Sequence, residues 1–156
     1  WEDSARAAEA LGLRVVLLRT GLVLAPEGGL LGRLRTPFRL GLGGRLGNGQ
    51  QWMPWIHIDD LCRLMLFALD NKLEGTFNAL GNNDTNNEMT KRLAKWLKRP
   101  LLLPNIPAFV LRLILGERAV LVLSDLRASN HKIKQAGFSF KYTSLDSVFK
   151  SFFKKR

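Results

Sequence analysis

The sequence has few of the residues on which most catalytic and metal sites depend. It contains one cysteine, one tyrosine and two histidines among 156 residues. Cys62 cannot form an intrachain disulfide, so we expect a reducing, cytoplasmic compartment. His57 lies between two isoleucines and has no cysteine or second histidine at ligand spacing. We therefore expect no metal site there and a structural imidazole, hydrogen-bonded near Asp59 and Asp60.

Long apolar runs are also missing. The longest one, 106–115, is interrupted by Arg112 and bounded by Pro107 and Gly116, whereas a membrane-spanning helix needs about 20 apolar residues. We expect a buried or docking helix here, with attachment to a membrane surface as the alternative. No secretory or transit segment is visible in the sequence.

Acidic side chains are scarce. The 13 acidic residues face 24 lysines and arginines, which gives a net charge of +11 and ordinarily favours an anionic partner. The basic residues are scattered, however, and lack the aromatic interleaving of a surface that binds single strands. We do not expect a nucleic-acid partner, although a small basic module for nucleic acid or anionic surfaces stays the alternative. An acidic amino-terminal half of the protein could also balance the charge.

Two patterns of dinucleotide-dependent reductases are absent. A Gly-x-Gly-x-x-Gly turn read from Gly41 through Gly43 would place its third glycine at Leu46. This loop also has no strand leading directly into it. Tyr142 is followed at the fourth position by Asp146 and not by lysine, so it does not begin a Tyr-x-x-x-Lys pattern. We therefore assign no catalytic residue within this chain.

Hydrophobic periodicity and turn signals predict alternating helices and strands, which is an α/β protein. The strongest signal is a helix over 60–69, whose apolar residues recur at every third or fourth position. Thr85 and Glu88 form a capping-box pattern before another helix. The other predictions are helices over 1–11, 30–34 (before Pro37), 107–116, 129–136 and 145–152, and strands over 15–18, 76–78 and 138–142.

The stretch 41–61 joins a glycine-rich loop, a strand and a helix. Residues 55–58 alternate in a way that is typical of a short strand. Asp59 or Asp60 then offers a carboxylate to the free N–H groups of the following helix. In the loop, glycines permit a tight path and amide side chains supply both donors and acceptors. We expect this stretch to contribute to ligand recognition.

These segments together resemble a known family. From Trp1 to Phe153 the chain is similar to the carboxyl-terminal half of the atypical extended short-chain dehydrogenase/reductases of the NAD-dependent epimerase/dehydratase family. The subfamily is the one described as nucleoside-diphosphate-sugar epimerase or cell-division-inhibitor-like. The segments that carry the resemblance, in the family's order, are Trp1-Glu2, Val15–Leu24, Ala25–Gly29, Pro37–Gly44, Trp55–Asp60 and Gln135–Phe138.

The resemblance implies the carboxyl-terminal part of a Rossmann-like doubly wound sheet together with a small substrate-binding domain. Residues 1–27 would end the Rossmann-like core. Residues 28–156 would form mainly the substrate-binding subdomain, with core elements returning near 56–80. The family's pyrophosphate-binding turn and its catalytic Ser/Thr, Tyr and Lys would lie upstream of Trp1. The chain would then be inactive alone and would need this amino-terminal half as its partner.

The resemblance also implies a cofactor, NADP with NAD as the alternative, and a small-molecule substrate. This substrate would be a small carbonyl compound, an alcohol or a sugar-nucleotide-like compound. The segment that would pass behind the nicotinamide comprises Arg19, Thr20, Gly21, Leu22 and Val23. The candidate substrate-binding residues are Arg39, Arg45, Asn48, Gln50, Gln51, Trp52 and Trp55.

One position departs from the family pattern. Many sugar-nucleotide epimerases have an arginine that binds the diphosphate where this chain has Met53. Methionine cannot make that bidentate contact, although Arg45 or Arg39 could compensate. A non-catalytic regulatory relative of the fold is a further alternative. The sequence makes no prediction of the oligomeric state.

Overall fold

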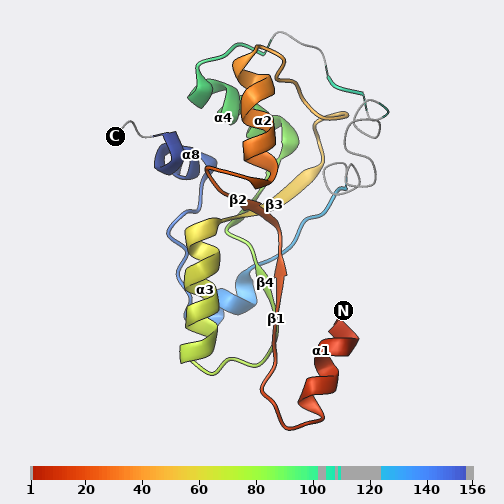
Figure 1. Cartoon of the computed structure of the whole chain (residues 1–156), viewed down its shortest axis with the longest axis vertical. Coiled ribbons are helices and arrows are strands. Elements are labelled where there is room, and N and C mark those ends of the chain that lie inside the picture. Colours follow the sequence, from red (N-terminus) through yellow and green to blue (C-terminus); the bar gives the residue numbers. More distant parts are fainter. Residues whose placement is uncertain (1, 102–104, 108, 110–123, 154–156) are drawn as a thin grey trace.

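The computed structural model describes residues 2–101, 105–107, 109 and 124–153, and it combines helices with parallel strands (Figure 1). Trp1, most of the apolar stretch 106–115 and the stretch 117–123 lie outside the described residues. The expected α/β class is confirmed. The elements in chain order are α1 (Glu2–Glu9), β1 (Val16–Thr20), β2 (Leu22–Leu24), α2 (Gly29–Arg39), β3 (Trp52–His57), α3 (Ile58–Asp70), β4 (Gly75–Ala79), β5 (Asn82–Thr85), α4 (Asn86–Leu97), α7 (His131–Gln135) and α8 (Leu145–Phe153).

The strands form two sheets. β1 pairs with β4 in parallel, and β3 lies between its parallel neighbour β2 and its antiparallel neighbour β5. Gly21 separates β1 from β2, where the chain passes from one sheet to the other. A Cβ atom at Gly21 would lie 2.7 Å from the carbonyl carbon of Pro54, so glycine is needed for this approach to β3. The segment 19–23 therefore includes the end of β1 at Thr20 and the start of β2 at Leu22.

β3 leads directly into α3, and a histidine caps this helix. The Nδ1 atom of His57 accepts a hydrogen bond of 3.0 Å from the backbone N–H of Asp59. Asp59 and Asp60 lie in the first turn, where carboxylates interact favourably with the positive end of the helix dipole. The prediction that one of these aspartates caps the helix is wrong, because the imidazole already has that role.

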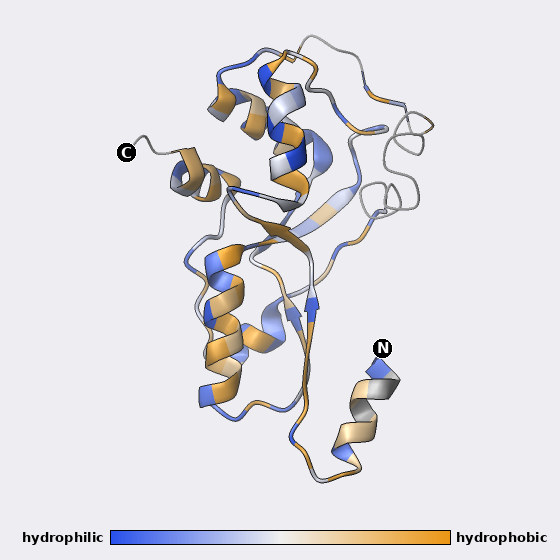
Figure 2. Ribbon diagram, viewed as in Figure 1, coloured by the Kyte–Doolittle hydropathy of each residue, from blue (hydrophilic) through white to orange (hydrophobic). Residues whose placement is uncertain are grey.

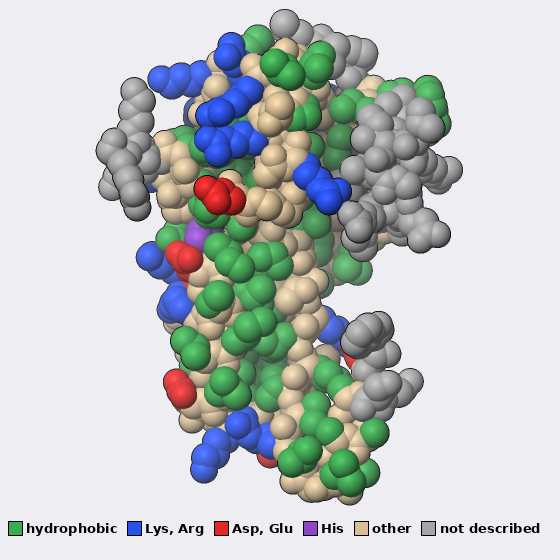
Figure 3. All heavy atoms as spheres, viewed as in Figure 1, with side chains coloured by type: hydrophobic (Ala, Val, Ile, Leu, Met, Phe, Trp, Pro, Cys, Tyr) green, Lys and Arg blue, Asp and Glu red, His purple; other side chains and the backbone are tan. Residues whose placement is uncertain are grey.

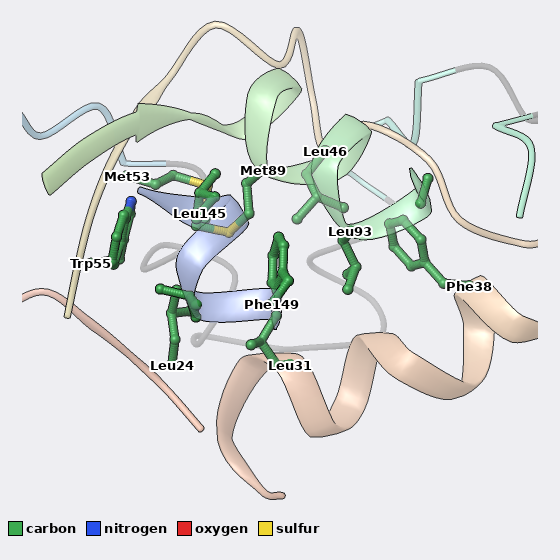
Figure 4. Packing of buried hydrophobic residues seen from close by; sticks show 12 residues of the cluster. Leu24, Leu31, Phe38, Leu46, Met53, Trp55, Met89, Leu93, Leu145 and Phe149 are labelled. Atoms are coloured by element: carbon green, nitrogen blue, oxygen red, sulfur yellow. The ribbon is translucent and has the colours of Figure 1, made fainter. Parts of the chain in front are cut away.

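One hydrophobic cluster joins α2, α4 and α8 to β2 and β3, and Figure 4 shows side chains of the three helices meeting there. α2 continues through Pro37 to Arg39, beyond the expected end at residue 34. Pro37 removes one helical hydrogen bond. The last turn persists because Phe38, 3% exposed, packs into this cluster.

A second hydrophobic cluster packs α3 and α7 against β4 and β1. The predicted helix is confirmed, and Leu61, Leu64 and Ala68 of its apolar positions are buried. Met65 and Leu69, which the same spacing includes, are exposed. Figure 2 shows hydrophobic residues along both α3 and β1. None of the helices that the structure describes combines the length and apolar content required to cross a bilayer.

Two segments differ in type from the sequence predictions. β5 consists of four polar residues, and asparagine and aspartate, which make up three of them, are depleted in strands. Its pairing with β3 therefore gave no sequence signal. The alternating segment 138–142 is not a strand. The backbone N–H groups of Lys141 and Tyr142 instead donate to the buried carboxylate of Asp60.

An exposed apolar surface covers one side of α3. Met65, Leu66 and Leu69 are 46%, 61% and 62% exposed, and we call these three residues the α3 face. Val16 and Leu18 of β1 line a shallow hollow beside it. Figure 3 shows hydrophobic side chains gathered over this lower part of the molecule. Among the described strands, β1 has β4 as its one neighbour, so this side of the molecule carries both apolar surface and an open strand edge.

Candidate functional site

A hollow of about 380 Å³ lies where β1 ends. This volume is near the lower end of the range for small-molecule pockets, about 300–1,000 Å³. In open α/β sheets, ligands bind at the carboxyl ends of parallel strands, and this hollow occupies that position on β1. The residues that line it are Thr20, Gly21, Leu22, Met53, Pro54, Ser124 and Leu126.

The first wall of the hollow comes from the segment expected to bind the cofactor. Thr20, Gly21 and Leu22 line the hollow. The guanidinium of Arg19 instead binds the carboxylate of Glu2 on α1 at 2.6 and 2.7 Å. That hydrogen-bonded carboxylate raises the pKa of Arg19 above its ordinary value. Val23 packs against the second cluster. The structure thus places three of the five candidate cofactor residues around one hollow.

The second wall is formed by Met53 and Pro54 of β3. The Met53 side chain is 2% exposed and belongs to the first cluster. Its sulfur lies 3.4 Å from Nδ2 of Asn86, which donates to it. This position therefore contributes packing, and its side chain is not free to contact a phosphate group.

The third wall, residues 124–126, is attached to the edge of β3. The backbone N–H of Trp52 donates to Oδ1 of Asp125 at 2.9 Å, and the N–H of Leu126 donates to the carbonyl of Trp52 at 3.3 Å. The Arg127 guanidinium lies over the Trp52 ring, 4.6 Å from its centroid. Trp52 therefore holds the third wall in place, a role that sequence reasoning missed.

Asparagine side chains fix the residues after this wall. The amide of Asn83 donates to the carbonyl of Ala128 at 2.8 Å and accepts from its N–H at 3.1 Å. Asn78 donates to the carbonyl of Ser129, and Asn130 donates to the carbonyl of Leu80. A side-chain amide can thus replace a backbone partner, which explains how polar β5 positions a distant segment.

The glycine-rich loop forms a cap over α4. The first two backbone N–H groups of α4, on Asn86 and Asn87, donate to the carbonyls of Gln51 and Gly49 at 3.0 and 2.9 Å. The Gln51 side chain donates to the carbonyl of Leu46 at 3.0 Å and is buried. These contacts satisfy the orphan donors of a helix start, so this part of the loop has a structural role.

The remaining candidate substrate residues are divided between the surface and the core. Arg39, Arg45, Asn48 and Gln50 are exposed, and none of them lines the hollow. Asn48 accepts a hydrogen bond from the backbone N–H of Gln50 at 3.0 Å. Their contact with a substrate stays a prediction.

Trp55 lies in the first cluster. It is fully buried, and its indole N–H donates to Oδ2 of Asp84 at 2.7 Å. Trp55 therefore packs in the first cluster and links β3 to β5 through this hydrogen bond. A substrate contact by Trp55 stays a prediction.

His57 is the most enclosed titratable ring described. It is 2% exposed and stacks between Tyr142 and Phe152, with ring centroids at 3.7 and 4.7 Å. Its Nε2 lies 2.9 Å from the hydroxyl of Ser151. Because Nδ1 accepts from the N–H of Asp59, we assign the ring proton to Nε2, where it donates to this hydroxyl.

The charge state of His57 follows from these surroundings. Burial lowers the pKa of His57, and this effect outweighs the opposite influence of Asp59 and Asp60. The expected structural role of the ring, hydrogen-bonded beside Asp59, is confirmed. Its neighbours Tyr142 and Ser151 were missed because no local sequence pattern joins them to residue 57. Among the described residues, no group of three or more potential metal ligands comes together.

Comparisons with known proteins cover nearly the whole chain. The family model described as "NAD dependent epimerase/dehydratase family" matches residues 2–79, and one described as "Domain of unknown function (DUF1731)" matches residues 106–152. An epimerase family protein of Staphylococcus aureus strain MW2 is 38% identical over 99% of this chain and 52% of its own length. A relative from Staphylococcus haemolyticus strain JCSC1435 is also 38% identical, over 96% of this chain and 50% of its own length.

Solved structures agree with these matches. Human epimerase family protein SDR39U1 (isoform 2), crystallised with NADPH, has a TM-score of 0.84 and 32% identity over 92% of this chain and 49% of its own. A nucleoside-diphosphate sugar epimerase from Corynebacterium glutamicum has a TM-score of 0.76 and 29% identity over 100% of this chain and 30% of its own. The chain spans about half the length of the curated relatives it matches.

Proposed function

Because this chain belongs to the NAD-dependent epimerase/dehydratase family, we propose that it is the substrate-binding half of an NADP(H)-dependent, epimerase-like oxidoreductase. The observation that carries this proposal is the hollow at the carboxyl end of β1, lined by Thr20, Gly21 and Leu22. The human relative crystallised with NADPH supports NADP over NAD. The single free thiol, Cys62, fits a reducing, cytoplasmic location.

The cofactor side of the hollow is formed by Thr20–Leu22. The apolar side chain of Leu22 and the hydroxyl of Thr20 fit the two parts of a nicotinamide, an apolar ring and a polar carboxamide. Bound nicotinamide supplies or accepts a hydride. Arg19 and Val23 keep this segment in place, the first through Glu2 and the second through the second cluster.

The division of the chain follows from the same proposal. Residues 1–27 end the Rossmann-like core, 28–156 form mainly the substrate subdomain, and core elements return near 56–80. The open edge of β1 and the α3 face then receive the amino-terminal half, which brings the dinucleotide turn and the catalytic residues. Large exposed apolar patches commonly mark such interfaces. The chain alone therefore has a substrate wall but transfers no hydride.

The proposal needs no nucleic-acid partner. On α4, Arg92 pairs with Asp146 and Lys91 lies 3.7 Å from Glu88. Two further arginines are paired in the described part of the chain, Arg19 with Glu2 and Arg63 with Asp60.

A fusion tests the proposed function. The portion of the Staphylococcus aureus relative that this chain does not cover is joined to Trp1, and binding of NADPH and NADH is measured by fluorescence. We expect NADPH to bind the fusion more tightly than NADH. The chain alone should show no hydride transfer. A hydride-transfer rate from the chain alone, or a folded fusion that binds neither dinucleotide, would overturn the proposal.

A threonine pair provides the matched control. Thr20→Val in the fusion removes one hydroxyl at the hollow and should weaken NADPH binding about fivefold, the effect of one hydrogen bond. Thr36→Val changes an exposed threonine on α2 outside the hollow and should leave NADPH binding unchanged. Equal effects of the two substitutions would remove Thr20 from the cofactor site.

A further inference from the structure

The hollow at the end of β1 has walls from both matched parts of the chain. Thr20–Leu22 and Met53–Pro54 belong to the epimerase match, whereas Ser124 and Leu126 belong to the domain of unknown function. Resting on the function proposed above, we infer that Ser124 and Leu126 form a substrate-selecting wall. The compound that this wall accepts is a small, uncharged carbonyl or alcohol compound with an apolar body.

The chemistry of the lining supports an uncharged compound. Leu22, Met53, Pro54 and Leu126 contribute mainly apolar surface, and the described residues of the lining carry no charged side chain. Thr20 and Ser124, whose side chains carry hydroxyl groups, line different walls of the same hollow. A few polar groups in an otherwise apolar pocket orient a ligand, and hydroxyls can both donate to a carbonyl and accept from an alcohol.

A diphosphate does not fit these surroundings. Bidentate arginine contacts are the usual means of binding such a group, but position 53 presents a buried methionine. Arg127, the nearest arginine along the chain to the third wall, stacks on Trp52. Asp125 does not line the hollow, but it lies between the two wall residues Ser124 and Leu126, and its negative charge disfavours an anion there.

Hydrogen bonds fix the backbone of the substrate-selecting wall, so the wall can distinguish between substrates. Trp52 makes hydrogen bonds to residues on both sides of the Asp125–Leu126 peptide bond, and Asn83 makes two to Ala128. Because these contacts fix the backbone, Leu126 can be 57% exposed and still occupy a defined position. A rigid first shell of this kind is what pocket specificity requires.

The test is a titration of the isotopically labelled chain followed by nuclear magnetic resonance. Cyclohexanone, cyclohexanol and UDP-glucose are the probes. We expect the two uncharged compounds to shift the backbone amide signals of Thr20, Ser124 and Leu126, with dissociation constants of about 1–10 mM. UDP-glucose should leave these three signals unchanged over the same range. UDP-glucose binding at these residues more tightly than cyclohexanone would overturn the inference.

Two lysine substitutions separate selection from general surface effects. Leu126→Lys should weaken cyclohexanone binding about fivefold, because it removes apolar contact from the hollow. Leu40→Lys, at a 70% exposed position outside the hollow, should leave that binding unchanged. Dispersed amide spectra of both variants show that they fold. The inference is contradicted if Leu126→Lys leaves cyclohexanone binding unchanged. It is also contradicted if cyclohexanone shifts the amide signals of the α3 face and not those of the hollow.

The same probes distinguish this inference from the proposed function. In the fusion, hydride transfer from NADPH to UDP-glucose but not to cyclohexanone would refute the substrate class and leave the oxidoreductase proposal standing. Cyclohexanone binding at Leu126 in a fusion that binds no dinucleotide would refute the oxidoreductase proposal and leave the selecting wall standing.

Discussion

Gly21 is the residue at which the chain changes sheets. The missing side chain lets its backbone approach Pro54, and a Cβ atom there would be only 3.1 Å from the backbone nitrogen of Trp55 as well. Since both neighbours are backbone atoms of β3, neither can rotate away. The sequence showed a glycine after a predicted strand but not that its backbone approaches β3.

Gly21→Ala should destabilise the chain by about 1–3 kcal/mol, the usual cost of overpacking. Gly32→Ala is the control, because a Cβ atom at Gly32 has no described neighbour closer than 3.7 Å. On α2 it should be neutral or stabilise by up to about 1 kcal/mol. The free energy of unfolding in urea measures both. Equal stability of the two variants would contradict the close approach.

Asp60 is a second residue whose role depends on distant backbone. Its fully buried carboxylate accepts from the N–H groups of Lys141 and Tyr142 at 3.0 and 2.8 Å and from Arg63 at 2.6 Å. We expect Asp60→Ala to cost about 3–5 kcal/mol, because it leaves buried donors unsatisfied. Asp59→Ala, at a side chain that is 57% exposed, should cost much less. Chemical denaturation of the two variants compares them.

His57 predicts a pH dependence of stability. Burial lowers its pKa in the folded chain, below the ordinary value of about 6.5 expected in the unfolded chain. Neutral His57 therefore favours the folded state fully above pH ~6.5. That contribution is lost as the pH falls toward the folded-state pKa.

The measurement is the free energy of unfolding between pH 7.5 and pH 5. His57→Gln should flatten the decrease that the wild-type chain shows below about pH 6.5. His131→Gln, at an exposed position, should retain it. A decrease of the same size in all three proteins would assign the effect to other groups.

At the scale of elements, hydrophobic periodicity predicted the helices α3, α4 and α8 but gave no indication of the polar strand β5. α3, α4 and α8 each bury one regular apolar face, and Thr85 caps α4 by accepting from the N–H of Glu88 at 3.3 Å. β5 carries no apolar alternation because its asparagines bind backbone on a distant segment. The third wall of the hollow was invisible for the same reason, since its partners lie 45 positions or more away along the chain.

The link between β5 and the third wall gives an element-scale prediction. Asn83→Ala removes both hydrogen bonds to Ala128. It should raise the hydrogen-exchange rate of the Ala128 amide about thirtyfold, since two bonds at roughly 1 kcal/mol each amount to about 2 kcal/mol. Asn71→Ala removes one hydrogen bond at the end of α3 and should leave that rate unchanged. Unchanged exchange in Asn83→Ala would show that other contacts hold the wall.

For the molecule as a whole, the family resemblance identified the fold, and the structure showed which apolar surfaces are exposed. The α3 face and the β1 edge are exposed in this chain. Their apolar residues could be read from the sequence as a helix face and a buried-type strand. Which of them lack a covering element could not be read, because burial depends on elements far apart in the chain.

The reaction rate of the Cys62 thiol tests whether the α3 face is covered. Cys62 is exposed, and it precedes Met65 and Leu66 by three and four positions, so all three share one side of α3. We expect the thiol to react readily with a disulfide reagent in the chain alone and at least about tenfold more slowly in the NADPH-binding fusion, where the interface is covered. Cys62→Ser gives the background. Equal reaction rates would place the amino-terminal half elsewhere.

The imidazole at the start of α3 has one more consequence. Its ring is walled by Tyr142 and Phe152 and bonded to Ser151, which lies 94 positions later in the chain. Removal of α8 would take away Ser151 and Phe152 and expose the His57 ring to water. Loss of α8 would then destabilise the start of α3, so the stability of this helix depends on a segment far away in the sequence.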